Sequence, residues 1–296
     1  MKLGLGTVQF GLDYGISNND GQVSEVEVEK IFSLAETRQV EVIDTAAAYG
    51  SSEEVIGRVL HENSPFKIVT KTLPLNKGGE IVTVKEANSV KDRFYRSLES
   101  LGLPRVYGLM VHYADDALAD RGGHLYSVLK ELKESGLVEK IGVSVYSPEV
   151  LEVVLQSWPD IELVQFPLNI YDQRMLKVLP RLKERNIELH SRSLFLQGLF
   201  FLPAEKLTGS LAPFVSHHQK FKQVLSERKA SVLAATMSFI QSVQSVDHVI
   251  VGAQNSEQLE QLLEAFENPA FDIAQGEFAH LASTEAMLID PSTWKN

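Results

Sequence analysis

The stretch from residue 138 to residue 165, VEKIGVSVYSPEVLEVVLQSWPDIELVQ, has two short apolar runs separated by a longer amphipathic segment. The first run is Ile141–Ser144 and the second is Leu163–Gln165. Between them Ser147 precedes Pro148, an order typical of a helix with proline at its first position. The stretch therefore predicts a strand, a helix and a second strand, and two strands joined in this way lie parallel in one sheet.

The same alternation extends along the chain in both directions. Apolar residues at helical spacing follow each short run, and the segment Ser24–Glu27 has the pattern of a capping box at a helix start. Residues 198–219 are predicted to be irregular, and a helix is predicted from about Lys220 to Val243. The predicted strands are Leu3–Thr7, Val42–Asp44, Ile68–Lys71, Leu109–His112, Ile141–Ser144, Leu163–Gln165, Ile187–Arg192 and Val249–Gly252.

Two folds share this alternation, a closed barrel and an open doubly wound sheet. The open fold carries a dinucleotide fingerprint in which a third glycine opens the first helix. Here Gly4 and Gly6 are followed by Thr7–Val8–Gln9, so the fingerprint is absent. Eight units in 296 residues favour a (β/α)₈ barrel, which needs roughly 250 residues. We expect one domain over residues 1–296.

Composition excludes several classes of function. The chain has no cysteine, which rules out disulfides, thiolate metal sites and cysteine nucleophiles. Its formal net charge of -11 argues against nucleic acid as a partner. The N-terminus lacks the pattern of a signal peptide, and no run approaches the about 20 apolar residues of a membrane span. The sequence predicts a cytoplasmic protein with a small-molecule substrate and no membrane partner.

The predicted strands end in polar side chains. Active sites of (β/α)₈ barrels lie at the carboxyl ends of the strands. One polar ending is commonly only a solvated loop residue, but an acid, a lysine and a histidine on three consecutive strands are typical of a catalytic mouth. The polar endings in chain order are Asp44, Lys71, His112, Ser144, Gln165 and Arg192.

Tyr49 adds a proton donor to this set. It follows Asp44 by five residues through small residues, and Gly50 behind it permits a tight turn that returns the phenol to the barrel mouth. A nearby Lys71 cation is expected to lower the phenol pKa from about 10, and Asp44 is expected to hold the lysine. His112 can orient a carbonyl oxygen. Together these groups predict general acid catalysis at a carbonyl.

At this point the sequence resembles the aldo-keto reductase superfamily over nearly its whole length. The resemblance implies a (β/α)₈ barrel, NAD(P)H binding and a catalytic tetrad of Asp44, Tyr49, Lys71 and His112. Residues 192–199 also look like members found in bacterial polysaccharide and sugar-modification pathways. The matching pieces are Gly4–Thr7, Asp44–Ala46, Tyr49–Gly50, Ser52–Glu53, Thr70–Lys71, Val111–His112, Gly142–Ser144, Val164–Gln165 and Gly252–Ala253.

The resemblance also implies a cofactor site, with NADP(H) expected over NAD(H). Ser144 and Gln165 match positions that bond the nicotinamide carboxamide, although Val145 stands where the family has asparagine. Arg192 stands where many members stack an aromatic ring on the nicotinamide, and a guanidinium can also stack. The residues expected to bind the cofactor are Ser144, Gln165, Arg192, Ser193, Gly198, Gly252, Ala253, Gln254 and Gln258.

The loop Gly252–Ser256 leads into a helix N-terminus, which is a natural anion site. The family binds the adenosine 2′-phosphate there, often with a basic residue, whereas this chain has Gln254 and Gln258. The substrate pocket is predicted to accept a partly polar carbonyl such as a sugar aldehyde. Its candidate lining residues are Phe10, Asp13, Tyr14, Tyr113 and the loop around Phe200.

Three other functions remain open from the sequence. Lys71 could form a Schiff base in a lyase. His112 with Asp115 and Asp116 could hold a hydrolytic metal, although neither an HxH nor an HExxH pair supports this, and no metal site is predicted. The barrel could also be a catalytically silent NADP(H)-binding sensor or subunit, a function that would not require all four tetrad groups.

Overall fold

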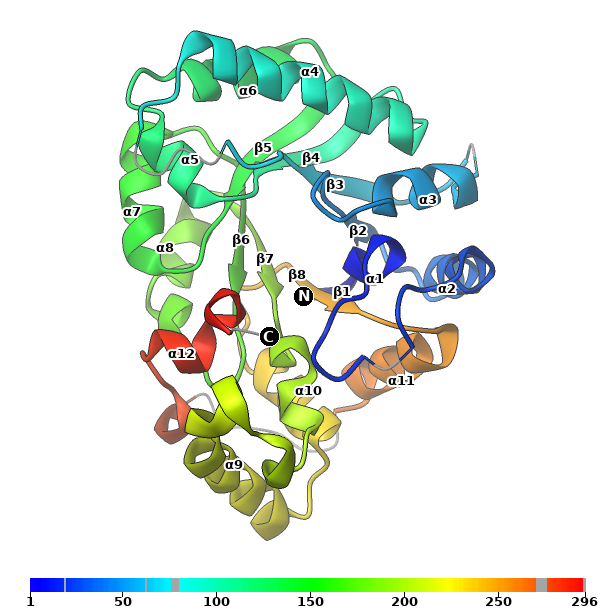
Figure 1. The fold of residues 1–296 in the computed structure, drawn as a ribbon, viewed down its shortest axis with the longest axis vertical. Helices are drawn as coiled ribbons and strands as arrows, with labels where there is room; N and C mark the ends of the chain where they lie inside the picture. The colour runs from blue at the N-terminus through cyan, green and yellow to red at the C-terminus, as the bar shows by residue number, and fades with distance from the viewer. Residues whose placement is uncertain (19, 62, 76–79, 270–275, 295–296) are drawn as a thin grey trace.

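The computed structural model describes residues 1–18, 20–61, 63–75, 80–269 and 276–294. Eight parallel strands pair in chain order and close into a barrel, so the predicted (β/α)₈ fold is confirmed. Figure 1 shows the strands at the centre and the helices around them. The strands are β1 (Lys2–Gly6), β2 (Val42–Asp44), β3 (Lys67–Lys71), β4 (Val106–Val111), β5 (Val138–Ser144), β6 (Leu163–Pro167), β7 (Glu188–Arg192) and β8 (His248–Gly252).

Helices follow the strands, and several begin at the caps that the sequence indicates. Ser147 caps α7 with Pro148 at its first position, and Ser24 caps α2. The predicted capping box at Ser24–Glu27 is only half formed, because the Glu27 carboxylate accepts from Ser256 and not from the Ser24 backbone. Among the described residues, no helix combines the length and the apolar character needed to cross a membrane. The principal helices are α2 (Glu25–Thr37), α3 (Ser52–Val59), α4 (Val84–Leu101), α5 (Ala114–Ala119), α6 (His124–Glu134), α7 (Pro148–Ser157), α8 (Leu179–Glu184), α9 (Val215–Arg228), α10 (Val232–Gln241) and α11 (Ser256–Glu267).

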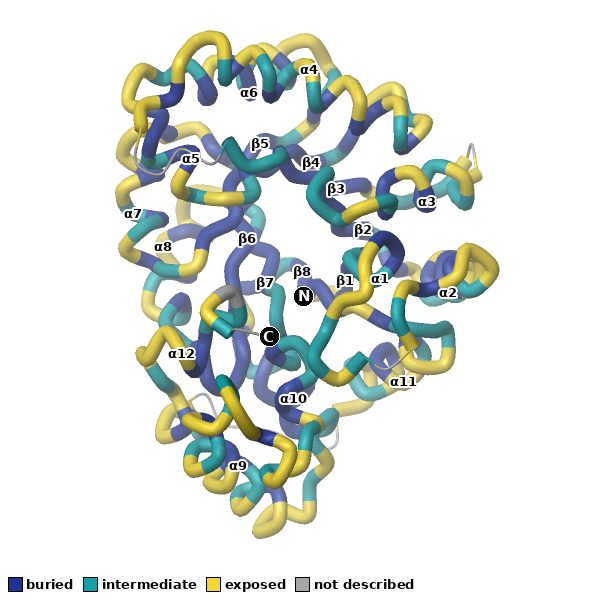
Figure 2. Tube along the Cα trace, in the orientation of Figure 1, coloured by how far each residue is buried: buried dark blue, intermediate teal, exposed yellow. Residues whose placement is uncertain are grey.

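The interior of the barrel is filled by a separate apolar cluster, which we call the central apolar layer: Val42, Val69, Met110, Leu163 and Ile250. Alternate residues of a strand point to the same side of the sheet, so residues two positions along also face the interior. The barrel interior is therefore polar on both sides of this layer, at the carboxyl-terminal ends of the strands and at their amino-terminal ends. Figure 2 shows the strands as mostly buried and the outer faces of the helices as exposed.

Glycine on β5 permits close packing against β6. A Cβ atom at Gly142 would lie 1.9 Å from the carbonyl oxygen of Leu163, which belongs to backbone that cannot move aside. A Cβ atom at Gly4 would instead meet the Cδ1 tip of Ile250 at 2.6 Å, and that side chain can rotate. Gly142 is therefore the less replaceable of the two.

We expect Gly142→Ala to lower the free energy of unfolding by at least about 3 kcal/mol, the upper end of ordinary overpacking. Gly4→Ala is the matched control and should cost about 1 kcal/mol. Urea unfolding followed by far-ultraviolet circular dichroism measures both variants. Equal losses for the two variants would contradict the distinction between a backbone clash and a side-chain clash.

The prediction of an irregular segment over 198–219 followed by one helix is wrong. Three short 3₁₀ turns occupy Leu196–Phe201, Ala204–Lys206 and Gly209–Phe214, and α9 already begins at Val215. A left-handed Lys229 (φ 52°) ends α9, and Ser231 caps a separate helix, α10. The apolar residues of the segment pack as core and stabilise these turns, a contribution that helical periodicity does not reveal.

Candidate active site

A cavity of about 810 Å³ opens at the carboxyl ends of the strands. Asp44, Tyr49 and His112 line one part of it, and Arg192 lines another. The cavity also reaches the loop that begins at Gly252, where the resemblance places the adenosine end of a cofactor. Its volume lies in the range of small-molecule and cofactor sites.

Lys71 and Asp44 form a buried ion pair beneath this cavity. Their side chains are 0% and 5% exposed, and Lys71 Nζ lies 2.7 Å from Asp44 Oδ2. The same amine donates to the carbonyl oxygen of Thr45 at 2.9 Å, and Gln165 Nε2 donates to Asp44 Oδ1 at 2.8 Å. Burial lowers the pKa of Lys71, and the neighbouring Asp44 carboxylate opposes that shift. These contacts fix the pair in one arrangement.

Tyr49 lies directly above this pair. The loop after β2 turns back because Tyr49 N donates to the carbonyl oxygen of Ala46 at 2.9 Å, and Gly50 adopts a positive φ of 57°. Lys71 Nζ lies 5.1 Å from the centroid of the Tyr49 ring, and the His112 ring meets it edge-on with centroids 5.6 Å apart. The structure thus brings the four predicted side chains together.

The expectation of a lowered pKa at Tyr49 is wrong, because other influences outweigh the Lys71 cation. Burial raises the pKa of the Tyr49 phenol well above its usual value, and the Asp44 carboxylate raises it further. The cation that opposes this shift most is Arg192. Lys71 is already paired with Asp44, so the lysine cation and the aspartate carboxylate act on the phenol together. The phenol therefore keeps its proton at neutral pH.

His112 is neutral in the same surroundings. Burial, followed by the cations of Lys71 and Arg192, lowers the pKa of its imidazole to about 3. Its Nδ1 is buried and has no hydrogen-bond partner within the described part of the chain. A neutral imidazole can either donate or accept one hydrogen bond at each nitrogen, depending on the tautomer. His112 can therefore orient an oxygen in the cavity without competing with Tyr49 as an acid.

Ser144 and Gln165 are neighbours across β5 and β6, paired in register, and both are buried. The Gln165 amide donates to Asp44, while its Oε1 is buried without a partner among the described residues. That oxygen can accept from an amide of a ligand, as the resemblance implies. Val145 is fully buried in the apolar core, so it supplies no such contact.

Arg192 lies at the end of β7 with its guanidinium carbon 4.3 Å from the ring centroid of Tyr146. Its Nη1 donates to Ser193 Oγ at 3.3 Å, and Ser193 and Gly198 both line the cavity. The sequence prediction missed Tyr146, although it comes directly after Ser144 and Val145. A cation stacked on an aromatic face is already desolvated and aligned as a flat surface.

The N-terminus of α11 already holds an anion from within the chain. Asn255 caps the helix, and both the backbone N and the Oγ of Ser256 donate to Glu27 Oε1 at 2.8 Å. The bond from the Ser256 amide is the main reason that the pKa of Glu27 falls to about 2. Gln254 N donates to Gln258 Oε1, and both side chains line the cavity beside Gly252. Ala253, predicted with them, is buried.

Some pocket predictions are wrong. Tyr14 and Tyr113 line the cavity, and so does the loop around Phe200, through Gln197, Gly198 and Phe201. Phe10 is instead fully buried in the core, where its ring packs against that of Phe32. Asp13 accepts a hydrogen bond from Asn18 and does not line the cavity.

The alternative metal site at His112, Asp115 and Asp116 also lacks support. Asp116 Oδ2 accepts from the backbone N of Leu75 at 2.9 Å. Within the described ranges, the one group of three metal-ligating side chains is at the other end of the barrel.

The structure is a closed (β/α)₈ barrel whose mouth carries Tyr49 and His112 beside a buried lysine–aspartate pair. A family model described as Aldo/keto reductase family matches residues 2–281. The chain belongs to this family.

Two curated relatives agree with that membership. Aldo-keto reductase YhdN of Bacillus subtilis is 27% identical over 192 residues, covering 63% of this chain and 56% of the relative. An aldo-keto reductase of Mycolicibacterium vanbaalenii is 30% identical over 143 residues, covering 46% of each protein. The chain thus spans about half the length of the curated relatives it matches.

Solved structures share the fold at low identity. The holo form of aldo-keto reductase AKR11C1 from Bacillus halodurans has a TM-score of 0.74 at 19% identity, covering 95% of this chain and 90% of that one. Glycerol dehydrogenase AKR11B4 from Gluconobacter oxydans has a TM-score of 0.68 at 19% identity, covering 94% and 89%. These likenesses bear on the fold alone.

Proposed function

We propose that this protein reduces an aldehyde or ketone to an alcohol with a nicotinamide cofactor as the hydride donor. The observation that carries the proposal is the Tyr49 phenol, held protonated at the cavity beside neutral His112 and above the Lys71–Asp44 pair. When bound, the cofactor supplies hydride to the carbonyl carbon. Tyr49 Oη donates the proton to the carbonyl oxygen, and His112 orients that oxygen.

The cavity favours a small, partly polar substrate. The phenols of Tyr14 and Tyr113 line it, and Gln197 Nε2 donates to the Tyr14 hydroxyl at 2.9 Å. Phe201 adds an apolar wall. We propose a hydroxylated carbonyl compound of the sugar-aldehyde type, because hydroxyl groups can exchange hydrogen bonds with these phenols.

The residues present fit a nicotinamide dinucleotide. Gln165 Oε1 is an unsatisfied acceptor for the carboxamide, and the Arg192 guanidinium offers a flat face at the cavity. Gly252 and Gln258 line the far part of the same cavity. The NADP(H) expectation is weakened by Glu27, because its carboxylate takes the α11 amide that a 2′-phosphate would use.

We therefore expect Glu27→Gln to lower KM for NADPH selectively, by roughly fivefold for about 1 kcal/mol of removed repulsion. Steady-state kinetics with NADPH and NADH at fixed aldehyde measure the change in their ratio. Glu36→Gln, near the other end of α2 and paired with His61, is the matched control and should leave the ratio unchanged. An unaltered ratio in Glu27→Gln would show that this carboxylate does not select the cofactor.

Turnover of a panel of aldehydes and hydroxyaldehydes, followed by loss of NADPH or NADH absorbance, tests the proposed function. No consumption with either cofactor, combined with measurable cofactor binding, would instead support a binding sensor. Borohydride trapping with substrate tests the lyase alternative at Lys71. That alternative is disfavoured because the Lys71 amine donates to both Asp44 and Thr45.

A further inference from the structure

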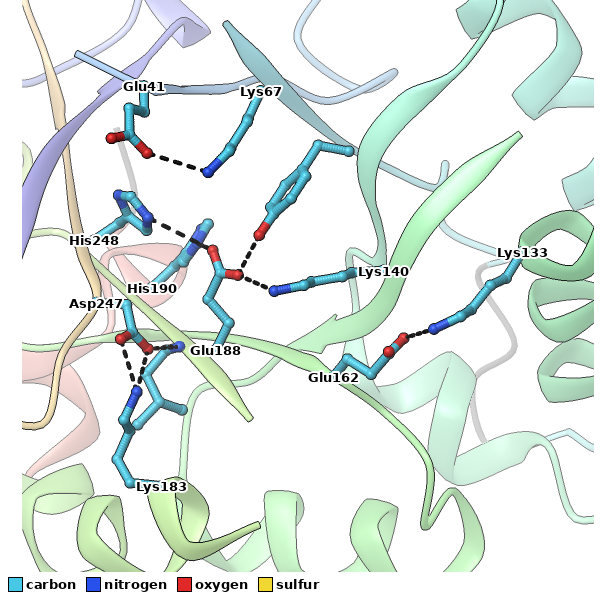
Figure 3. Close-up of polar contacts among 12 residues, drawn as sticks. Glu41, Lys67, Lys133, Lys140, Glu162, Lys183, Glu188, His190, Asp247 and His248 are labelled. Atoms are coloured by element: carbon cyan, nitrogen blue, oxygen red, sulfur yellow. Dashed lines mark hydrogen bonds and ion pairs between the residues drawn. The ribbon is translucent and has the colours of Figure 1, made fainter. Parts of the chain in front are cut away.

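Three side chains with metal-ligating atoms meet at the amino-terminal end of the barrel, opposite the candidate active site. Glu188 and His190 are two residues apart on β7 and face the same side of the sheet. His248, the first residue of β8, is the register partner of His190. Figure 3 shows these side chains turned toward one another. Their ligating atoms all lie within 4.8 Å of one another.

We propose that Glu188, His190 and His248 form a binding site for a divalent transition-metal ion of the zinc class. Two imidazole nitrogens and one carboxylate oxygen are a donor set that suits zinc, with water at the remaining position. His190 Nε2 lies 2.8 Å from Glu188 Oε1, and His248 Nε2 lies 3.6 Å from the same oxygen. Donors about 2.0–2.2 Å from one ion are spaced at about 3–3.5 Å from each other, so small side-chain rotations complete the geometry.

The imidazole of His248 faces Glu188 without a hydrogen bond to it. Its side chain is 10% exposed, and its Nδ1 is buried without a partner among the described residues. Its Nε2 stops 3.6 Å from Glu188 Oε1, beyond hydrogen-bond distance. A metal ion between His248 Nε2 and Glu188 Oε1 would give this imidazole nitrogen a partner.

The two oxygens of Glu188 have separate partners. Oε2 accepts from the Tyr107 hydroxyl at 2.5 Å and from Lys140 Nζ at 2.5 Å. Oε1 faces the two imidazoles. Hydrogen bonds of this kind orient a ligating carboxylate and strengthen metal binding. Lys140 therefore holds the carboxylate through the oxygen that the metal does not need.

Other cations near this end are paired with other acids, Lys183 with Asp247 among them. Lys2 and Lys67 both bind Glu41, and neither binds Glu188. Glu188 and His248 retain 11% and 10% side-chain exposure, which gives an ion access from solvent at the rim. A bound ion would connect β7 to β8, whose pairing comprises two register partners. We expect it to stabilise the closure of the barrel.

Zinc titration of the full-length, tag-free protein by calorimetry tests the site. We expect one Zn²⁺ per chain, no comparable binding of Mg²⁺ because that ion prefers oxygen ligands, and a higher thermal midpoint with Zn²⁺. Co²⁺ in place of Zn²⁺ should give a visible absorption band of a nitrogen- and oxygen-ligated ion. His248→Gln should weaken Zn²⁺ binding by more than about 100-fold.

His61→Gln is the matched control, since His61 forms an exposed pair with Glu36 at 3.0 Å but has no second imidazole. It should leave the affinity unchanged. Tyr107→Phe, which retains all three ligands, should weaken binding by about 10-fold and covers the case in which His248→Gln fails to fold. The proposal is overturned if the wild type lacks stoichiometric binding, if His248→Gln or Tyr107→Phe binds as tightly as the wild type, or if His61→Gln removes binding.

Discussion

Tyr49→Phe is expected to reduce kcat for carbonyl reduction by about 100- to 10,000-fold, the usual contribution of a general acid. Phenylalanine keeps the ring against His112 and Lys71 but removes the hydroxyl. The loss should therefore fall on turnover, with cofactor affinity nearly unchanged. Steady-state kinetics with an aldehyde, together with fluorescence titration of NADPH and NADH, separate the two quantities.

Tyr95→Phe is a suitable control, because Tyr95 is 46% exposed and lies on α4 outside the residues that line the cavity. It should retain wild-type kcat. If Tyr49→Phe kept more than a tenth of wild-type kcat, another group would have to supply the proton. If instead it lost cofactor binding, Tyr49 would be part of the cofactor site and its role as acid would remain unsupported.

Lys71→Met should lower the free energy of unfolding by about 3–5 kcal/mol, because it leaves the Asp44 carboxylate buried without its cation. Both side chains are almost fully buried, and Gln165 is the remaining side-chain donor to Asp44 among the described hydrogen bonds. The pH dependence of residual turnover should also change, since the amine lies 5.1 Å from the Tyr49 ring. Urea unfolding and pH–rate profiles measure the two effects.

The double variant Asp44→Asn with Lys71→Met separates stability from turnover. Removing both charges eliminates the unpaired carboxylate, so the double variant should be more stable than Lys71→Met alone. It should not recover kcat, because the electrostatic environment of Tyr49 is not restored. A stability of Lys71→Met equal to that of the wild type would contradict the buried-pair account.

Much of the fold could be predicted from local pattern. Each strand is a short apolar run, and parallel strands must be joined by helices, so eight repeats of this pattern favour the closed barrel that the structure shows. The position of Asp44, Lys71 and His112 follows from strand ends meeting at one mouth. Tyr49 could be placed there because Gly50 permits the turn that brings its ring back.

The pKa of Tyr49 could not be predicted in the same way. The meeting of strand ends at one mouth suggested that the Lys71 cation would dominate, whereas burial and the Asp44 carboxylate raise the pKa. Burial depends on packing among elements far apart in the chain. Glu27 at the α11 N-terminus was missed for the same reason, because it belongs to α2.

The group at the amino-terminal end gives only a weak sequence signal. Glu188 and His190 form an alternating pair on one strand, but the second imidazole, His248, comes from the next strand after two intervening helices. Spacing motifs such as HExxH detect ligands that share one element. Register between neighbouring strands, which the sequence does not state, brings these three residues together.

The central apolar layer has a consequence for how the two ends of the barrel can change. Its five side chains carry only hydrocarbon and thioether groups, so they offer no relay for protons or ordered water between the carboxyl-terminal and amino-terminal mouths. Proton transfer through the interior from one mouth to the other is therefore blocked at this layer. Natural variation could add, tune or erase chemistry at the amino-terminal rim while leaving the reaction at the opposite rim intact.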